Sequence, residues 1–261
     1  MTSLTARRRH PAATLVVMLL ALGVMGALYA AFVPREADAA SGSSMAATDE
    51  GKRLFLTNCS SCHGLHAEGT SIGPTLVGVG AASVDFQVGT GRMPAAQLGA
   101  QVPQKRVEFT PEQVSALAAY VASLGPGPSI PDESAYDSNG ANMARGGEIY
   151  RTNCSMCHNY AGSGGALTHG QYAAKLRGVE PKYMYEAMIT GPQQMPVFGD
   201  GTLTPDQKKD VIAFLQNAST EPNPGGASLG KIGPVTEGIV GWFVGIGALI
   251  GCAVWLGAKA R

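Results

Sequence analysis

The sequence has no excess of charge of either sign, because 19 Lys and Arg residues balance 19 Asp and Glu residues. Nucleic-acid binding depends on a basic surface, and beyond the N-terminus the chain has no run of Lys or Arg. We therefore expect no nucleic-acid partner. The sequence also lacks cysteines for a disulfide framework, since four of its five cysteines lie in two short motifs. We find no pattern of nucleophile and acid–base pair that would indicate a catalytic site of its own.

The two cysteine motifs are Cys-x-x-Cys-His sequences. They comprise Cys59, Cys62 and His63, and again Cys154, Cys157 and His158. This signature attaches a c-type haem: both thiols bond to the porphyrin edge, and the histidine is placed to ligate the iron. One copy would also fit a redox dithiol followed by a histidine. Two copies in similar flanks predict two covalently bound haem c groups and an electron carrier.

The flanks of the two motifs form an internal repeat. The segment from Gly51 to Cys59 matches the segment from Gly146 to Cys154 position by position. Each copy later carries Thr-Pro-x-Gln, at 110–113 and at 204–207, where Thr caps a helix and Gln completes a capping box. We expect Tyr120 and Phe214 to pack these last helices across the first ones. The repeat predicts two tandem all-α domains, at residues 45–124 and 143–218.

Each predicted haem needs a second axial ligand, and methionine opposite histidine raises the reduction potential. Met93 and Met195 are each followed by proline, which holds the preceding residue extended, and we expect them to be these ligands. Met184 and Met188 compete with Met195 but lie in a predicted packed helix. Two histidines are weaker candidates: His66 is too close to His63 to reach the opposite face, and His169 would serve only if Met195 does not.

A ligating histidine usually donates its free ring N–H to a carbonyl oxygen. In the first domain we expect the acceptor to be the carbonyl oxygen of Pro74, in the stretch 73–76. The matching stretch of the second domain is predicted at 164–167. It lacks the proline but still offers a backbone carbonyl oxygen as the acceptor, and we expect its loop to be less rigid.

Two uncharged hydrophobic segments, 12–33 and 238–258, frame the chain. Each is long enough to span a bilayer core as a helix. Basic residues flank the outer end of both, which predicts cytoplasmic termini and extracytoplasmic haem domains, in a cell-membrane protein with two spans. The first segment has an alternative interpretation as a cleaved signal peptide, because Ala37-Asp38-Ala39 resembles a cleavage site. Its apolar run exceeds the usual length for a signal peptide, so we favour a retained anchor.

Three stretches rich in Pro, Gly, Ser and Asp are predicted linkers, at 34–50, 125–142 and 219–237. The middle one separates the two haem domains. We expect it to be flexible and to let the second domain swing.

The two motifs resemble those of class I cytochrome c domains. The arrangement of anchor, two haem domains and anchor resembles the dihaem cytochrome c subunit of actinobacterial menaquinol–cytochrome c reductase, a cytochrome bc complex. That resemblance implies a chain that works beside a cytochrome b subunit and takes electrons from a Rieske iron–sulfur subunit. It further implies transfer to the dinuclear copper centre of a haem-copper oxidase. The chain would then be the electron-transfer subunit of a translocase.

Two other functions are compatible with the motifs. One is the cytochrome c subunit of a membrane-bound periplasmic dehydrogenase, although such subunits often carry a further haem and lack a second span. The other is a dihaem peroxidase, which needs an open or displaceable iron ligand rather than two Met-Pro pairs.

Overall fold

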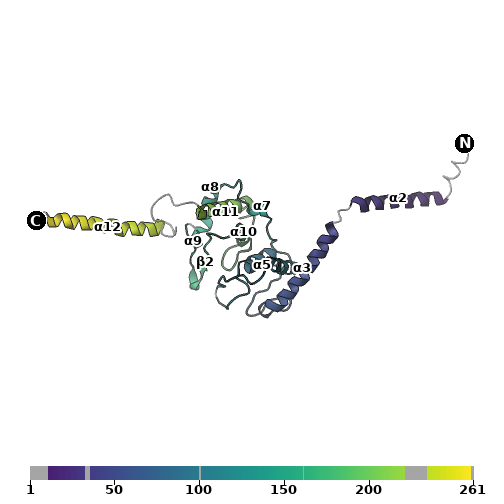
Figure 1. Cartoon of the computed structure of the whole chain (residues 1–261), viewed down its shortest axis with the longest axis horizontal. Coiled ribbons are helices and arrows are strands. Elements are labelled where there is room, and N and C mark those ends of the chain that lie inside the picture. Colours follow the sequence, from purple (N-terminus) through teal and green to yellow (C-terminus); the bar gives the residue numbers. More distant parts are fainter. Residues whose placement is uncertain (1–10, 33–35, 100, 161, 221–233, 260–261) are drawn as a thin grey trace. The chain divides into compact units, whose positions relative to one another are not determined.

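The computed structural model describes residues 11–32, 36–99, 101–160, 162–220 and 234–259. The chain divides into two units, Met1–Ala46 and Ala47–Arg261. The first unit contains helix α2 (Pro11–Phe32) and the start of helix α3 (Glu36–Asn58), both labelled in Figure 1. The predicted linker at 34–50 is thus wrong from Glu36 onward, where the chain is already helical. Alanine, the strongest helix former, is frequent in this stretch.

The two predicted membrane segments differ in the structure. Helix α12 (Pro234–Lys259) contains a 22-residue apolar stretch, Gly238–Lys259, that is long enough to cross a membrane. In α2 the described apolar stretch, Ala12–Leu28, is shorter than such a span. Val33, the last residue of the predicted first segment, lies outside the described residues. Among the described residues, one helix therefore meets the criterion for a membrane span.

The first of the two predicted domains is built on a close helix crossing. Helix α3 continues through α4 (Ser60–His63) to α5 (Gly80–Gly89) and α6 (Pro111–Ser123). A Cβ atom at Gly51 would lie only 1.9 Å from the carbonyl oxygen of Ala116, so glycine allows α3 to touch α6. The rings of Phe55 and Tyr120 meet at this crossing, with centroids 5.3 Å apart. The buried core forms around it.

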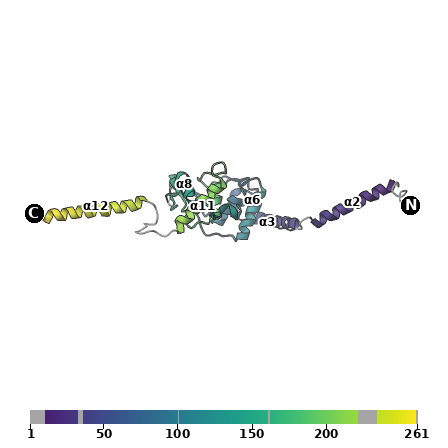
Figure 2. The ribbon, with the colours of Figure 1, turned by 90° about the horizontal axis from the view of Figure 1, so that it is seen from above.

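The second domain repeats this crossing with α8 (Met143–Asn153) and α11 (Pro205–Thr220), which lie together in Figures 1 and 2. Between them come α9 (Ser155–His158) and α10 (Pro181–Thr190). A Cβ atom at Gly146 would lie 1.9 Å from the carbonyl oxygen of Asp210, and the rings of Tyr150 and Phe214 are 5.4 Å apart. The predicted packing of Tyr120 and Phe214 is confirmed.

The two predicted capping boxes are also present. Gln113 N donates to Thr110 Oγ1 at 3.3 Å, and Thr110 N donates to Gln113 Oε1 at 3.0 Å. The box of Thr204 and Gln207 has the same two bonds, at 3.3 and 2.9 Å. These boxes start α6 and α11 at the predicted residues.

The chain is mostly helical, as predicted, and the second domain adds one short hairpin. Strands β1 (Gly165–Ala166) and β2 (Tyr172–Ala173) pair antiparallel, with Gly165 opposite Ala173. A 3₁₀ turn, η1 (Thr168–Gly170), joins them. The first domain has no strand among its described residues.

The segment between the domains is packed, so the prediction of a flexible linker at 125–142 is wrong. Ala82 N donates to the carbonyl oxygen of Pro128 at 3.1 Å, and Ile130 packs on the first core. Helix α7 (Glu133–Tyr136) follows and packs Tyr136 on the second core. Apolar residues in this stretch therefore tie it to both domains. The third predicted linker falls largely on residues 221–233, outside the described residues.

The two domains contact each other through α5 and α10. Lys182 Nζ lies 2.6 Å from Asp85 Oδ2, and the Phe86 and Tyr183 rings stack edge to face at 6.4 Å. Glu186 is fully buried beside this ion pair, and burial, together with the neighbouring Asp85, raises the pKa of Glu186 to about 9. A protonated carboxyl group thus lies at this interface at neutral pH.

Two candidate haem sites

The first Cys-x-x-Cys-His motif forms one tight helical turn. Cys62 N and His63 N both donate to the carbonyl oxygen of Cys59, at 3.1 and 3.0 Å. This turn carries both thiols and the imidazole on neighbouring positions of α4. His63 is buried, and its Nδ1 lies 2.8 Å from the predicted acceptor, the carbonyl oxygen of Pro74. With Nδ1 used as a donor, Nε2 is left available to an iron.

The second motif forms the same turn, with bonds of 3.2 and 2.9 Å from Cys157 N and His158 N to Cys154. His158 Nδ1 lies 2.8 Å from the carbonyl oxygen of Ala174, not of a residue in 164–167. The acceptor predicted for the second domain is therefore wrong. The histidine-to-acceptor spacing is 11 residues in the first domain and 16 in the second. The five extra residues (16 minus 11) belong to the loop that forms the β1–β2 hairpin.

Backbone hydrogen bonds show that Pro74 and Ala174 are equivalent despite this spacing. Leu76 N donates to Ala67 O, and Leu176 N donates to Gly162 O, both at 2.8 Å. Each acceptor carbonyl stands two residues before one of these leucines. The second loop thus returns to the same path after the hairpin.

The two methionines predicted as axial ligands lie in loops that follow α5 and α10. Met93 is half-buried against the first core, and Met195 is half-buried against the second. Met184 and Met188 are buried in α10, as expected for a packed helix. The two competing histidines, His66 and His169, are exposed.

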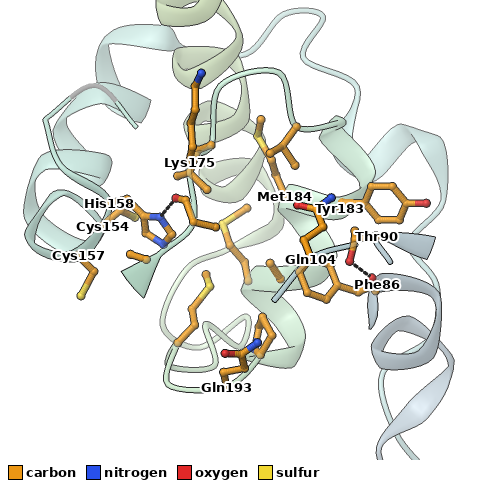
Figure 3. A pocket seen from close by; sticks show the side chains of 18 of the residues that line it. Phe86, Thr90, Gln104, Cys154, Cys157, His158, Lys175, Tyr183, Met184 and Gln193 are labelled. Carbon is orange, nitrogen blue, oxygen red and sulfur yellow. Dashed lines mark hydrogen bonds between the residues drawn. The ribbon is translucent and has the colours of Figure 1, made fainter. Parts of the chain in front are cut away.

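A cavity of about 660 Å³ opens beside the second motif. Cys154, Cys157 and His158 lie on one side of it in Figure 3. Met195 also lines the cavity. Most of the remaining lining is apolar and includes Leu167, Leu176, Val179, Met184, Met188 and Phe198. A flat apolar macrocycle attached to the two thiols fits these walls, with His158 and Met195 as candidate iron ligands.

Cys59 and Cys154, the first cysteines of the two motifs, do not have the character of the reactive thiol in a redox dithiol. Burial, with a smaller contribution from the second thiol of each motif, raises the pKa of Cys59 and of Cys154 to about 11. Redox-active Cys-x-x-Cys pairs instead have lowered thiol pKa values. The alternative of a dithiol followed by a histidine is therefore disfavoured.

The electrostatics of His158 suit iron ligation. Burial lowers the pKa of His158, against the opposing effect of its hydrogen bond to Ala174. The imidazole is therefore neutral at physiological pH, which is the form that binds metals.

One residue near the second site was missed by the sequence-based reasoning. Tyr150 Oη donates to the carbonyl oxygen of Asn159 at 2.5 Å and lies 3.3 Å from that of His158. Burial raises the pKa of Tyr150 to about 12, so the hydroxyl remains a donor. Phe55 occupies the equivalent position in the first repeat. The Phe-to-Tyr difference was the available signal.

The repeated helix crossing and the Cys-x-x-Cys-His turn define a c-type cytochrome. The family model "Cytochrome c" matches residues 48–125. The model "Cytochrome C oxidase, cbb3-type, subunit III" matches residues 141–215. The residues present thus fit haem c, which supplies a one-electron iron couple when bound.

Curated relatives identify the family more closely. The "Cytochrome bc1 complex cytochrome c subunit" of Mycobacterium tuberculosis is 43% identical over 94% of this chain and 90% of its own length. The subunit of the same name from Corynebacterium diphtheriae is 39% identical over 98% of this chain and 97% of its own length. The chain belongs to this family of cytochrome c subunits of the cytochrome bc1 complex. It is therefore an electron-transfer subunit of a quinol–cytochrome c reductase, and the dehydrogenase alternative is set aside.

A solved chain from the reducing HAO-like protein complex of Kuenenia stuttgartiensis has a TM-score of 0.34. It is 16% identical over 65% of this chain and 95% of its own length. It is too distant to bear on the fold.

Proposed function

We propose that this chain carries two haem c groups and relays electrons out of a menaquinol-oxidising cytochrome bc complex. The donor is the Rieske iron–sulfur subunit, which works with the cytochrome b subunit. The acceptor is the dinuclear copper centre of a haem-copper oxidase. One observation carries this proposal: two domains that touch each contain a complete site. Each site consists of a Cys-x-x-Cys-His motif, a carbonyl acceptor for its histidine and a methionine.

The residues of each site have distinct roles. Cys59 and Cys62, and likewise Cys154 and Cys157, anchor a haem covalently. His63 with Met93, and His158 with Met195, ligate its iron. The carbonyl oxygens of Pro74 and Ala174 accept the Nδ1 protons and hold each imidazole in one orientation, at 2.8 Å in both domains.

We place the first domain next to the donor and the second domain next to the oxidase. In this arrangement both hydrophobic segments, 12–33 and 238–258, span the cell membrane, and both termini are cytoplasmic. The haem domains then lie on the extracytoplasmic side. The candidate span Gly238–Lys259 supports the C-terminal anchor.

The relay is tested by removing one haem at a time in the native complex. Replacing Cys154 and Cys157 by alanine should leave the first haem attached and rapidly reduced by quinol, while oxygen uptake stops. Replacing Cys59 and Cys62 should instead prevent quinol from reducing the second haem. Oxygen consumption that continues in membranes of the first variant, with other oxidases inhibited, would contradict the relay.

The membrane arrangement has a separate test. The intact mass of the native protein reports its N-terminus. A full-length chain with two haems supports the retained anchor, whereas a mature N-terminus at Ala40 or Ser41 would show that the first segment is a signal peptide.

A further inference from the structure

The cavity of the second haem site is walled partly by the first domain. Phe86, Thr90 and Gln104 come from the first domain and face the Cys154 side across the cavity in Figure 3. Arg92 lines the same cavity. It directly precedes Met93, the proposed axial ligand of the first haem. One short segment thus contributes to both sites.

The guanidinium of Arg92 is held in place by its own domain. Its Nη1 donates to Thr90 Oγ1 at 2.6 Å, and its Cζ lies 4.8 Å from the centroid of the Phe86 ring. Thr90 is buried, and its hydroxyl in turn donates to the carbonyl oxygen of Phe86 at 2.5 Å. These contacts fix the cation at the wall of the cavity and use one of its five N–H donors.

This cation has no carboxylate partner in the part of the chain that the structure describes. The ion pairs found there join Arg53 to Glu50, Lys105 to Glu108, Arg145 to Asp210, Lys182 to Asp85 and Lys208 to Asp200. Arg92 is half-buried, and a partly buried charge is costly unless it is paired. The cavity that Arg92 lines is mainly apolar, but the second domain adds the cations Lys175 and Arg177 and the carboxylate Glu180 to its wall.

We propose that Arg92 of the first domain binds the propionate carboxylates of the haem held by the second domain. Haem carries two such carboxylates, and a guanidinium matches a carboxylate with two parallel N–H donors. The second haem site is then complete only when the first domain is docked on it. This inference rests on the proposed haem at Cys154, Cys157 and His158.

The test compares Arg92→Gln with Arg106→Gln in the purified native complex by redox titration of both haems. Arg106 loses the same charge from the same domain, but it is exposed and does not line the cavity. A positive charge next to the haem favours the reduced state, which carries one more electron. Loss of that charge therefore lowers the reduction potential of the haem. In Arg92→Gln we expect the reduced-to-oxidised ratio of the second haem at fixed ambient potential to fall about tenfold, equivalent to about 59 mV for a one-electron centre.

Arg92→Lys should retain most of the wild-type ratio, and Arg106→Gln should retain all of it. The variants Met93→Ala and Met195→Ala, which each remove one sulfur ligand, identify which potential belongs to which haem. A shift confined to the first haem, or no larger shift than in Arg106→Gln, would overturn the proposal.

Two further measurements keep this test separate from the proposed function. Haem content per chain shows directly whether the second site is loaded: a wild-type chain with a single haem refutes the two-haem proposal, not the role of Arg92. If Arg92→Gln fails to accumulate, Thr90→Val removes the hydroxyl that holds the guanidinium. It should shift the same haem in the same direction by a smaller factor, and an unchanged potential in Thr90→Val would then overturn the inference.

Discussion

The two cytochrome c domains share a framework but differ in how each encloses its site. In the first, His63 is buried and its acceptor lies 11 positions further along the chain, whereas in the second the spacing is 16 positions and includes a hairpin, and Cys157 is exposed. The second cavity then takes part of its wall from the first domain. The helix crossing and the motif turn are therefore common to both domains, while the loops adapt each site to its surroundings.

The two cores also differ in the polar and charged side chains that they bury. In the first domain the buried carboxyl group is that of Asp85, at the interface. The second domain buries Glu186, Lys208 and Asp210, among which Lys208 Nζ lies 2.5 Å from Asp200 Oδ1 and Asp210 pairs with Arg145. In each pair the partner of the buried group is at least half exposed. Removing Asp200 or Arg145 would leave a buried charge without its partner, which is costly.

The largest effect is expected from removing one axial methionine at a time. Met93→Ala and Met195→Ala should each abolish the sulfur-to-iron absorption band of one haem only and lower the potential of that haem, because methionine ligation raises it. The absorption spectrum of the oxidised protein measures the band, and a redox titration followed by absorbance measures the potential. Met184→Ala serves as the control and should leave both bands intact. If both haems keep sulfur ligation in either axial variant, that ligand assignment is wrong.

The next effect probes what the domains share. Gly51→Ala and Gly146→Ala would each place a Cβ 1.9 Å from a backbone carbonyl oxygen of the crossing helix. Because backbone must shift, we expect each to lower the free energy of unfolding of its own domain by about 3 kcal/mol. Thermal unfolding followed at the haem bands measures this. Gly199→Ala, where nothing lies within 4 Å of the added Cβ, is the control and should change the free energy of unfolding little. If Gly51→Ala is as stable as this control, the helix crossing does not require glycine at position 51.

A pH-dependent effect is expected at the contact between the domains. Glu186 has a pKa of about 9 in the folded chain, above its ordinary value of 4.5, because of burial and then of Asp85. The folded state therefore keeps a proton that the unfolded state loses, and this contribution to stability is lost as pH rises from about 4.5 to 9. Glu186→Gln should flatten that decline and raise the unfolding temperature at pH 8.

The matched control for this experiment is Glu148→Gln on α8, where the side chain is exposed. It should keep the wild-type slope of stability against pH. Lys182 and Asp85 face Glu186 and remain in both variants, so the comparison isolates one carboxyl group. An unaltered slope in Glu186→Gln would rule out this carboxyl as the source.

The smallest effect is expected at the Phe-to-Tyr difference. Tyr150→Phe removes the hydroxyl that donates to Asn159 O and converts the second domain to the pattern of Phe55 in the first. We expect a loss of about 1 kcal/mol in the free energy of unfolding of the second domain. Tyr160→Phe, at a side chain that is 54% exposed, is the control and should change less. Equal unfolding temperatures for the two variants would mean that this hydrogen bond contributes nothing.

Local sequence signals predicted the parts of this fold that depend on neighbouring residues. The Cys-x-x-Cys-His spacing predicted one-turn motifs, and Thr-Pro-x-Gln predicted the starts of α6 and α11. The repeat placed Tyr120 and Phe214 at equivalent crossings. The motif and the capping signal operate within a few residues, and the repeat extends what is found in one domain to the other.

The failures came where distant parts of the chain decide the structure. Ala174 was missed as the His158 acceptor because five extra residues displace it from the position expected by analogy with Pro74. The segment at 125–142 has a linker composition, but Ile130 and Tyr136 find apolar partners in the two cores. The contribution of Arg92 to the second cavity depends on domain docking, which neither repeat encodes locally.

One glutamine at the contact between the domains acts as a substitute for a neighbouring strand. Gln101 Nε2 donates to the carbonyl oxygen of Tyr172 at 2.7 Å, and Tyr172 N donates to Gln101 Oε1 at 2.8 Å. The side-chain amide thus occupies both polar groups of one residue on the outer edge of β2. Successive residues of a strand point these groups to opposite sides, so a slip by one residue would leave the amide without its matching pair. This part of the hairpin edge is thereby protected from pairing with another chain.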